Sequence, residues 1–235
     1  INSTCVEITP VGASNVWVAS PYFSLCDVLL QVMDQQVESG EQSADFDAFL
    51  DAYKRRLIDH IDCAVLEQNR FREDRRKFGR RPLQSVFTRD CIGRGRDIDD
   101  GGALYNWVEC SFVGMANLAD SLAVIRDEVF EERRMTLNEL NALLKDNFSD
   151  AEPLRQRLLK GHPKYGNDEP AVDELVQHMT AFCKAQCDRY KMLPDNSHFV
   201  PGAFCWIMHE VLGRQCGATP DGRRAGFPFA DGGGP

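Results

Sequence analysis

Residues 103–130 read ALYNWVECSFVGMANLADSLAVIRDEVF, and this stretch decides the class of fold. Its first part, 103–112, is rich in aromatic and aliphatic residues and predicts a buried strand. Gly114 then opens a helix that extends to about Phe130. The apolar side chains of this helix recur at helical spacing: Leu118, Leu122, Ile125 and Val129. A strand, a turn and a helix in succession form a β/α unit, so we predict an α/β fold.

Helical patterns dominate the rest of the chain. Asp45 precedes the clearest of them, an apolar stripe that predicts a helix over 46–65. Thr136 and Glu139 have the spacing of a capping box and predict the start of another helix. Further helices are expected at 22–37, 115–130, 137–147, 152–160 and 171–190, whereas strands are expected only at 15–20, 103–112 and 199–207. We therefore expect a helix-rich α/β fold with few strands, neither an antiparallel sheet nor, in these residues alone, a closed barrel.

The composition excludes several classes of protein. The chain has 235 residues, of which 43% are hydrophobic and 27% are charged, as in an ordinary soluble globular protein. A net charge of -9 argues against nucleic acid as a partner. No apolar run approaches the roughly 20 residues of a membrane-spanning helix, and the first residues show no signal-peptide pattern. We expect a cytoplasmic protein with neither nucleic acid nor membrane as a partner.

Two polar stretches resemble ligand sites but favour structural roles. The Gly-x-Gly at Gly93 lacks a third glycine, and the acidic residues Asp97, Asp99 and Asp100 would repel phosphate, so 93–102 is expected to form a turn. The run 72–81 is rich in arginine but mixes both signs of charge. It indicates the solvated end of a helix rather than a phosphate site.

The cysteines indicate free thiols rather than a metal site or a disulfide framework. There are nine, at positions 5, 26, 63, 91, 110, 183, 187, 205 and 216, and no two have Cys-x-x-Cys spacing. Cys183 and Cys187 lie on one face of a predicted helix, but no further ligand stands at suitable spacing. We expect all nine thiols to be reduced, with no bound metal, in a reducing compartment.

One short segment places a thiol beside a carboxylate. Residues 4–7, TCVE, lie among small and turn-forming residues that favour a loop, where residues i and i+2 point the same way. Cys5 and Glu7 could therefore face one small volume. A sulfur centre beside a carboxylate suits chemistry that removes an atom from a substrate and then moves a proton. Taken alone, however, a single cysteine is more often a small buried hydrophobe.

Four segments, taken together and in order, resemble the glycyl radical enzymes, the pyruvate formate-lyase-like family. They are 4–7 (TCVE), 97–106 (DIDDGGALYN), 163–168 with 172–173 (PKYGND and VD), and 217–226 with 230–232 (GATPDGRRAG and ADG). One such match would be weak, but four in the family's order span most of the chain. The resemblance is to the dehydratase and C–X lyase branch, because residues 5–7 have the Cys-x-Glu form.

The resemblance implies a barrel of ten strands in two half-barrels, wrapped in helices. Residues 1–235 would be part of that barrel domain, with the first half-barrel and the C-terminal glycyl radical domain outside them. Cys5 would be the thiyl position, and Glu7 would be the acid/base. The cofactor would be a protein-derived glycyl radical on a residue outside this chain, with no bound nucleotide or metal. Expected partners are a small polar substrate, a radical-SAM activating enzyme and a second copy of the protein in a homodimer.

Departures from the family pattern leave alternatives open. Thr4 stands where pyruvate formate-lyase proper has a second cysteine, which disfavours acyl transfer. Dehydratases often have glycine at the position of Thr4 and proline at that of Ile8. We predict a radical lyase or dehydratase of anaerobic metabolism in the full-length protein, with this chain alone inactive. The alternatives are formate C-acetyltransferase chemistry and a catalytically silent structural segment, and the substrate is left open.

Overall fold

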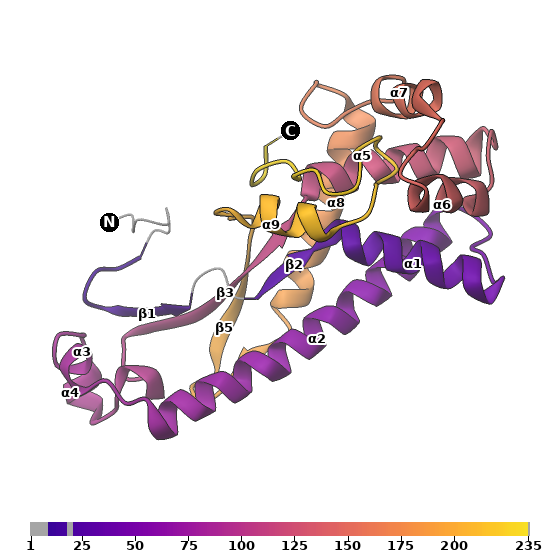
Figure 1. Ribbon diagram of the computed structural model, residues 1–235. Helices are drawn as coiled ribbons and strands as arrows, with labels where there is room; N and C mark the ends of the chain where they lie inside the picture. The colour runs from indigo at the N-terminus through magenta and orange to yellow at the C-terminus, as the bar shows by residue number, and fades with distance from the viewer. Residues whose placement is uncertain (1–8, 18–20, 235) are drawn as a thin grey trace. The chain divides into compact units, whose positions relative to one another are not determined.

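A computed structural model describes residues 9–17 and 21–234, which form two compact units (Figure 1). Within the described residues, the first unit comprises 9–22, 60–111 and 182–202, and the second comprises 23–59, 112–181 and 203–234. Each unit is built from segments far apart in the sequence. The two units are therefore described in turn.

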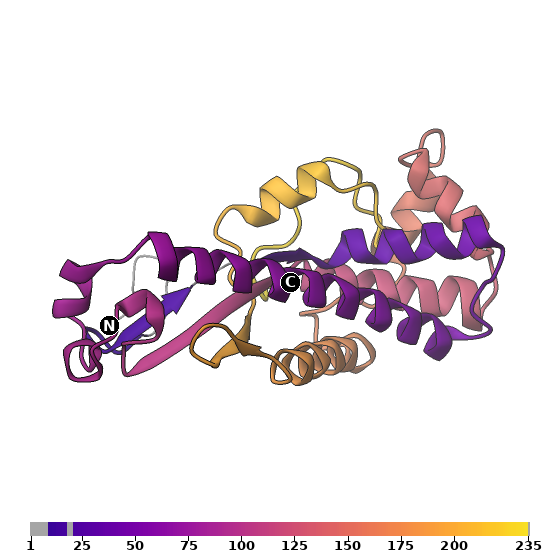
Figure 2. The same ribbon diagram turned by 90° about the horizontal axis from the view of Figure 1, so that it is seen from below.

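The first unit is organised by a mixed sheet of five strands (Figures 1 and 2). The strands are β1 (Ser14–Trp17), β2 (Tyr22–Ser24), β3 (Tyr105–Val113), β4 (Lys191–Met192) and β5 (Ser197–Gly202). Their order is β1-β3-β5-β4, and β2 also pairs with β3. The central pairs β1–β3 and β3–β5 are parallel, and the pair β4–β5 is antiparallel. The sequence predicted that the sheet would not be predominantly antiparallel, and the parallel central pairs agree with this prediction.

The two faces of this sheet differ in burial. On one face, Val108, Cys110 and Phe199 are at most 2% exposed. The Cys110 Sγ lies 3.8 Å from Sγ of Cys187, and the ring of Phe199 packs edge-on against that of Tyr190. Because the end of α8 (Pro170–Cys187) packs here, we call this the covered face. Helix α2 (Phe46–Phe78) contributes its part from residue 60 onward to the same unit.

Side chains on the opposite face alternate with those on the covered face, as strand geometry requires. The strand register places Trp107 beside His198 and Glu109 beside Val200. His198 is exposed and the other three residues are half-buried. We call this side of the sheet the open face.

The second unit is almost entirely helical. It contains α1 (Leu25–Ser39), α5 (Met115–Ile125), the π-helical segment η2 (Arg126–Glu131), α6 (Leu137–Lys145), α7 (Glu152–Lys160), α9 (Met208–Gln215) and the first parts of α2 and α8. Its core is formed by residues such as Leu29, Leu122 and Leu140, none of which is exposed to solvent. Helix α1 packs against both α5 and α6. The apolar stripes predicted from the sequence are therefore core faces.

The sequence predicted several helix ends correctly. The capping box is present, since the Glu139 backbone N–H donates to Thr136 Oγ1 over 3.2 Å and the Thr136 N–H donates to the Glu139 carboxylate over 2.7 Å. Helix α7 has the predicted bounds. Gly114 caps α5 with a φ of 85°, in the left-handed region where glycine is favoured.

Other boundaries were wrong. Helix α1 begins at Leu25 rather than Tyr22, because Tyr22–Ser24 pairs with β3 and Ser24 caps the helix. The segment Pro82–Val86, for which no helix was expected, is the short helix α3, with proline in its first turn. Helix α9 is absent from the helices expected from the sequence. The predicted helix over 115–130 is present, but its last turns are the π-helical η2.

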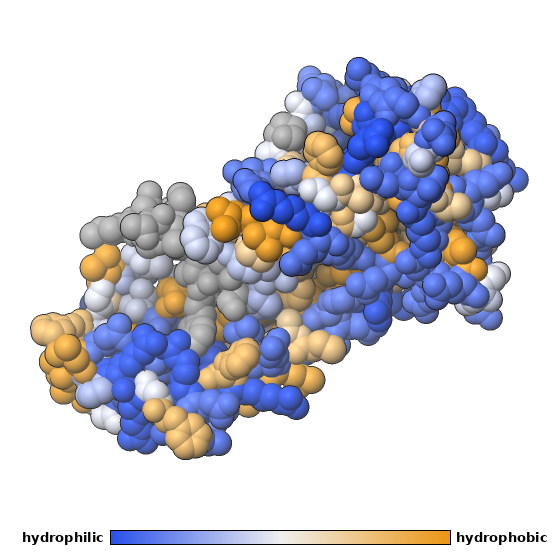
Figure 3. Space-filling model, in the orientation of Figure 1, coloured by the Kyte–Doolittle hydropathy of each residue, from blue (hydrophilic) through white to orange (hydrophobic). Residues whose placement is uncertain are grey.

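Large apolar side chains remain exposed around α3 and α4 (Cys91–Arg94) in the first unit. They are Leu83, Val86, Phe87 and Ile92, which are 57–75% exposed. Orange surface gathers at this end of the unit in Figure 3. Contiguous apolar surface of this kind is typical of regions that contact other protein.

Candidate functional site

The two predicted site residues, Cys5 and Glu7, lie outside the described residues. Their shared orientation therefore stays a prediction. The structure does describe the segment that follows them, from Thr9 into β1. The candidate site is accordingly built from the groups that hold this segment.

Backbone hydrogen bonds fix the approach to β1. The Ala13 N–H donates to the Pro10 carbonyl over 3.1 Å, which closes a turn. The Arg89 N–H donates to the Gly12 carbonyl over 2.7 Å, and the Tyr105 N–H donates to the Ala13 carbonyl over 3.0 Å. The chain that leaves the cysteine segment is thus attached to two distant segments before the strand begins.

A side chain of β1 adds a third attachment, to the second family segment. The Asn15 side-chain amide donates to the Ile98 carbonyl over 2.8 Å and lies 3.4 Å from Asp99 Oδ1. Ile98 and Asp99 belong to the short 3₁₀ helix η1 (Ile98–Asp100). The turn at 97–102, part of the second family segment, therefore holds the strand that follows the cysteine segment.

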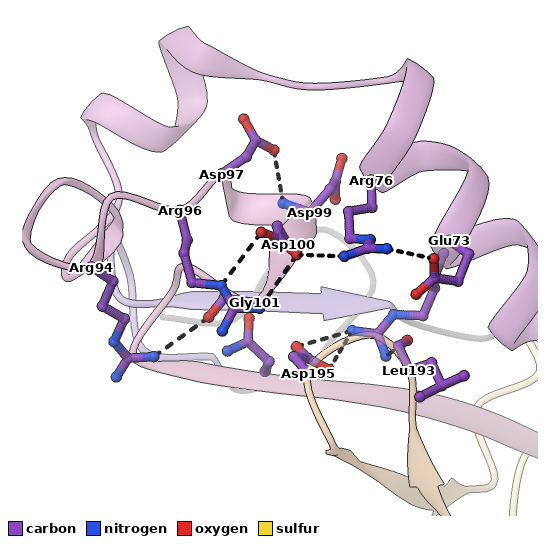
Figure 4. Close-up of polar contacts among 12 residues, drawn as sticks. Glu73, Arg76, Arg94, Arg96, Asp97, Asp99, Asp100, Gly101, Leu193 and Asp195 are labelled. Carbon is purple, nitrogen blue, oxygen red and sulfur yellow. Dashed lines mark hydrogen bonds and ion pairs between the residues drawn. The ribbon is translucent and has the colours of Figure 1, made fainter.

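The carboxylates of this turn are matched by arginines and by local N–H and O–H groups (Figure 4). Asp97 caps η1 by accepting the Asp99 N–H over 3.0 Å. The buried Asp99 side chain, 3% exposed, lies 3.0 Å from Arg75 and 3.3 Å from Arg81. Asp100 pairs with Arg96 on the surface. Residues 95–102 form a turn around η1, as predicted, whereas Gly93 and Arg94 belong to α4.

Two glycines of the turn are required by close approach. Gly101 has a φ of 72°, and a Cβ built there would overlap the Cβ of Asp195. A Cβ on Gly102 would overlap the Arg96 carbonyl. The Gly-Gly pair of this segment is therefore explained by packing.

Arg72 corrects the prediction that 72–81 is a solvated helix end. Its side chain is 3% exposed and forms a salt bridge of 3.1 Å with Asp195, which is 4% exposed. Arg72 Nη1 also donates to the Leu193 carbonyl over 2.6 Å and to Ser197 Oγ over 2.9 Å. The pattern of charges in the sequence could not reveal the burial of Arg72, because the residues that pair with it lie more than 120 positions further along the chain.

In the second unit, the third and fourth family segments meet around a cavity of about 560 Å³. Lys164 Nζ donates to the Asp221 carbonyl over 3.2 Å and lies 3.7 Å from Asp120 Oδ2. The Asp221 carboxylate accepts from Thr219 Oγ1 over 2.5 Å and from Asn117 Nδ2 over 2.7 Å. The sequence order of the segments gave no sign of this contact.

Arg223 holds the loop of the fourth segment together. Its guanidinium is buried and donates to the carbonyls of Gly213 and Phe227, over 3.3 Å and 2.7 Å, and to that of Gly217. It also lies 4.6 Å from the centre of the Phe229 ring. These contacts give Arg223 a structural role.

Burial raises the pKa of Asp120 to about 6. The Tyr165 N–H, which donates to Asp120 over 2.9 Å, and the nearby Lys164 oppose this shift but do not cancel it. Asp120 therefore changes its charge near neutral pH, at the wall of the cavity.

A second buried carboxylate lies on η2 and was not predicted. Glu128, with no exposed side-chain surface, lies 3.0 Å from Arg134 and 2.8 Å from Arg157. His162 bridges this carboxylate and that of Asp127, at 2.9 Å and 3.1 Å. The only sequence signal for this cluster was a histidine at the start of a loop.

The eight cysteines within the described residues are free thiols, and all but Cys63 are buried. Burial raises the pKa of Cys183 to about 12 and that of Cys110 further above its usual range. Within the same residues, no group of three or more His, Cys, Asp or Glu side chains could hold a metal ion. Cys110 and Cys183 are thus poor nucleophiles, whereas Cys5 lies outside the described residues.

The fold is shared with a solved radical dehydratase. The glycerol-bound B12-independent glycerol dehydratase from Clostridium butyricum matches with a TM-score of 0.84 at 30% identity, over 94% of this chain and 29% of that chain. The prediction of a helix-rich α/β piece of the glycyl radical enzyme barrel is confirmed.

Proteins with similar sequences also include named dehydratases. The probable dehydratase YbiW of Escherichia coli is 39% identical over 160 residues, which are 65% of this chain and 20% of that protein. The (2S)-3-sulfopropanediol dehydratase of Klebsiella oxytoca is 29% identical over 247 residues, 98% of this chain and 29% of that protein. The chain thus spans between a fifth and a third of the length of these relatives.

The family model described as pyruvate formate lyase-like matches residues 1–213. The chain belongs to this family of glycyl radical enzymes, as its four segments predicted.

Proposed function

We propose that the full-length protein carrying this chain is a glycyl radical lyase or dehydratase, in which Cys5 abstracts hydrogen and Glu7 acts as acid and base on a small polar substrate. The observation that carries this proposal is the family match over residues 1–213, which includes the Cys-x-Glu segment. Relatives named as dehydratases support it.

The chemistry follows from the two side chains. A glycyl radical supplied by the full-length protein would accept the thiol hydrogen of Cys5, and the Cys5 sulfur would then take a hydrogen atom from a substrate carbon. The radical on that carbon makes the adjacent O–H more acidic. Glu7 would remove its proton while the neighbouring group leaves, and would return a proton to a departing hydroxide, which leaves as water. Cys5 would finally give the hydrogen atom back to the product.

The hydrogen bonds that hold the segment after Glu7 suit the proposed role of Cys5 and Glu7. A thiol and a carboxylate must be held in fixed relation to the substrate, and small displacements reduce rates severely. Hydrogen bonds to Gly12 and Ala13, together with the contact from Asn15 to Ile98, attach the segment that follows Glu7 to the rest of the first unit.

The remaining parts of the proposal concern partners and location. The full-length enzyme would need a radical-SAM activating enzyme and would form a homodimer in the cytoplasm. Among the described residues, no helix has the length and apolarity needed to cross a membrane.

Two substitutions in the full-length enzyme test the proposal. Cys5→Ser is expected to abolish turnover while the glycyl radical signal in electron paramagnetic resonance persists, because an O–H bond is too strong to exchange hydrogen with a Cα radical. Glu7→Gln should reduce turnover by at least about a hundredfold, the low end for loss of a general base. Hydrogen exchange between substrate and solvent through Cys5 should persist in Glu7→Gln.

Near-normal turnover by Glu7→Gln would assign that residue a structural role in the loop. Turnover by Cys5→Ser would refute the thiyl mechanism. A protein that forms no radical after treatment with an activating enzyme would be a catalytically silent member of the family.

A further inference from the structure

The cavity of about 560 Å³ in the second unit takes part in no step of the proposed chemistry. Its wall is formed by α5, α7 and the loops that follow α7 and α9 (Figure 1). Asn117 and Asp120 lie three positions apart on α5 and share one face of that helix. Arg155 and Leu159 do the same on α7, four positions apart. A cavity of this volume is large enough for a small organic ligand.

Basic side chains outnumber carboxylates on the wall of this cavity. The basic residues are Arg155, Lys164, Arg223 and Arg224, and the acidic residues are Asp120 and Asp221. The chain as a whole carries a net charge of -9, so the sign of the charge on this wall is opposite to that of the chain. This balance favours an anion as the ligand.

Some of these charges are already used by the protein. The Asp221 carboxylate and the Arg223 guanidinium are buried and hydrogen-bonded within the loop of the fourth family segment. Arg155 and Arg224 both pair with Glu152, which does not line the cavity, at 2.7 Å and 2.8 Å. Two guanidinium groups that share one carboxylate leave an excess of positive charge at the cavity.

Lys164 and Asp120 line the cavity with polar atoms that keep hydrogen-bonding capacity. The Lys164 ammonium has three N–H groups, and it donates to the Asp221 carbonyl over 3.2 Å. Its distance of 3.7 Å from Asp120 Oδ2 is too long for a hydrogen bond. Asp120 uses its other oxygen, Oδ1, to accept the Tyr165 N–H over 2.9 Å. The ammonium and Oδ2 can therefore both bond to a ligand.

The Asp120 carboxyl can hold a proton in this position. Burial and the nearby charge of Asp221 raise its pKa, the Tyr165 N–H and Lys164 lower it, and the resulting pKa is about 6. When a second carboxylate approaches such a group, the two share one proton, because like charges in contact cannot both ionise. A carboxylate that enters this cavity is therefore bound together with a proton taken from solvent.

We propose that this cavity binds a small organic carboxylate, which accepts hydrogen bonds from Lys164 and Arg224 and shares a proton with Asp120. The apolar part of the ligand packs on Leu159 and Pro228 of the same wall. The site is made of residues of the second unit alone, and it does not depend on the radical chemistry proposed above.

Calorimetry on the full-length enzyme before activation tests this inference. The probe is butyrate, and butyramide is its uncharged counterpart of similar size. Butyrate should bind at least about tenfold more tightly, because the amide carries no charge to match the two cations. Butyrate should also bind about tenfold more tightly at about pH 5.5 than at about pH 7.5. Titrations in two buffers of different ionisation enthalpy should show that binding takes up a proton.

Two variants and a control locate the site. Asp120→Asn keeps an acceptor for the Tyr165 N–H and places an N–H donor where Oδ2 lies, so butyrate should still bind, without dependence on pH and without proton uptake. Lys164→Met should weaken butyrate binding by about tenfold or more. Lys160→Met, at an exposed position of α7 outside the cavity wall, is the matched control and should change neither the affinity nor its pH dependence.

Absence of butyrate binding, or equal binding of butyramide, would overturn the inference. Butyrate binding that Lys164→Met leaves unchanged would also overturn it, since the ligand would then occupy another site. A pH dependence that persists in Asp120→Asn has the same consequence, because the shared proton is part of the proposal. Failure of the radical mechanism would alter none of these results.

Discussion

At the residue scale, the turn at 97–102 shows why certain side chains cannot change. Asp99 and Asp195 are buried carboxylates that need their arginine partners, and Gly101 fits only because it has no side chain beside Asp195. The same turn holds Asn15 and thereby β1.

Gly101→Ala is expected to destabilise the protein by about 2 kcal/mol or more, because it combines a left-handed φ with a steric overlap. Urea unfolding measures the change. Gly93→Ala is the control: Gly93 lies in helix α4 with open space around its Cα, so alanine there should stabilise by about 0.5–1 kcal/mol. Equal effects of the two substitutions would contradict the packing explanation.

Asp120 should make stability depend on pH. Its pKa is raised to about 6 in the folded protein, against about 4 in an unfolded chain. The folded state therefore binds more protons between these values, and the contribution of Asp120 to stability falls as the pH rises from about 4 to 6. The free energy of unfolding of the wild type relative to Asp120→Asn should decrease over this window.

Glu139 provides a control of opposite sign. The Thr136 N–H and hydroxyl lower the pKa of Glu139 in the folded protein. The contribution of Glu139 to stability is therefore present above its pKa in the unfolded chain and is lost on acidification. The wild type relative to Glu139→Gln should gain stability as the pH rises. The same trend for both variants would show that the Asp120 pKa is not raised.

At the scale of the element, α2 carries two arginines one turn apart with different roles. Arg72 is buried against Asp195, whereas Arg76 is 39% exposed and pairs with Glu73. Arg72→Met should cost about 3–5 kcal/mol, because it leaves the Asp195 charge buried without its partner. Arg76→Met should cost less than about 1 kcal/mol, as for exposed ion pairs. Denaturant titration measures the loss in free energy of unfolding for each variant. Losses of similar size would contradict this distinction between the two arginines.

Elements with strong local signals could be predicted from the sequence. Apolar periodicity located α2 and α5, and the Thr136 capping box located the start of α6. The short strands β2 and β4 could not be predicted, because two or three residues form a strand only when a partner is present. The first helix was placed too early for the same reason: Tyr22–Ser24 has helical neighbours but pairs with β3.

The candidate site was predicted in part. The resemblance of four segments in order indicated the family, and it implied the roles of Cys5 and Glu7, which lie outside the described residues. The pairing of Arg72 with Asp195 was missed because it is a long-range contact.

At the scale of the whole molecule, the thiols should differ widely in reactivity. Cys63 is exposed, whereas Cys110 and Cys183 are buried with raised pKa values. A brief iodoacetamide pulse at neutral pH should label Cys63 rapidly and the other two only after unfolding, because the thiolate is the reactive form.

Mass spectrometry of peptides after the pulse locates the label, and Cys63→Ser should remove the rapid phase. After denaturation without reductant, nine thiols and no zinc or iron are expected. A disulfide or a stoichiometric metal would contradict the prediction made from cysteine spacing.

The parallel pairing of β1, β3 and β5 has a consequence for how the protein is made. Residues 14–17 have no sheet partner until residues 105–108 have been synthesised, and β3 gains β5 only when residues 198–202 follow. Contacts between such distant segments form slowly, because closing long loops costs conformational entropy. Strand β1 therefore stays without a sheet partner for about 90 residues of synthesis. In a nascent chain stalled before residue 105, only the contacts of Gly12 with Arg89 and of Asn15 with Ile98 could hold the segment that leads into β1.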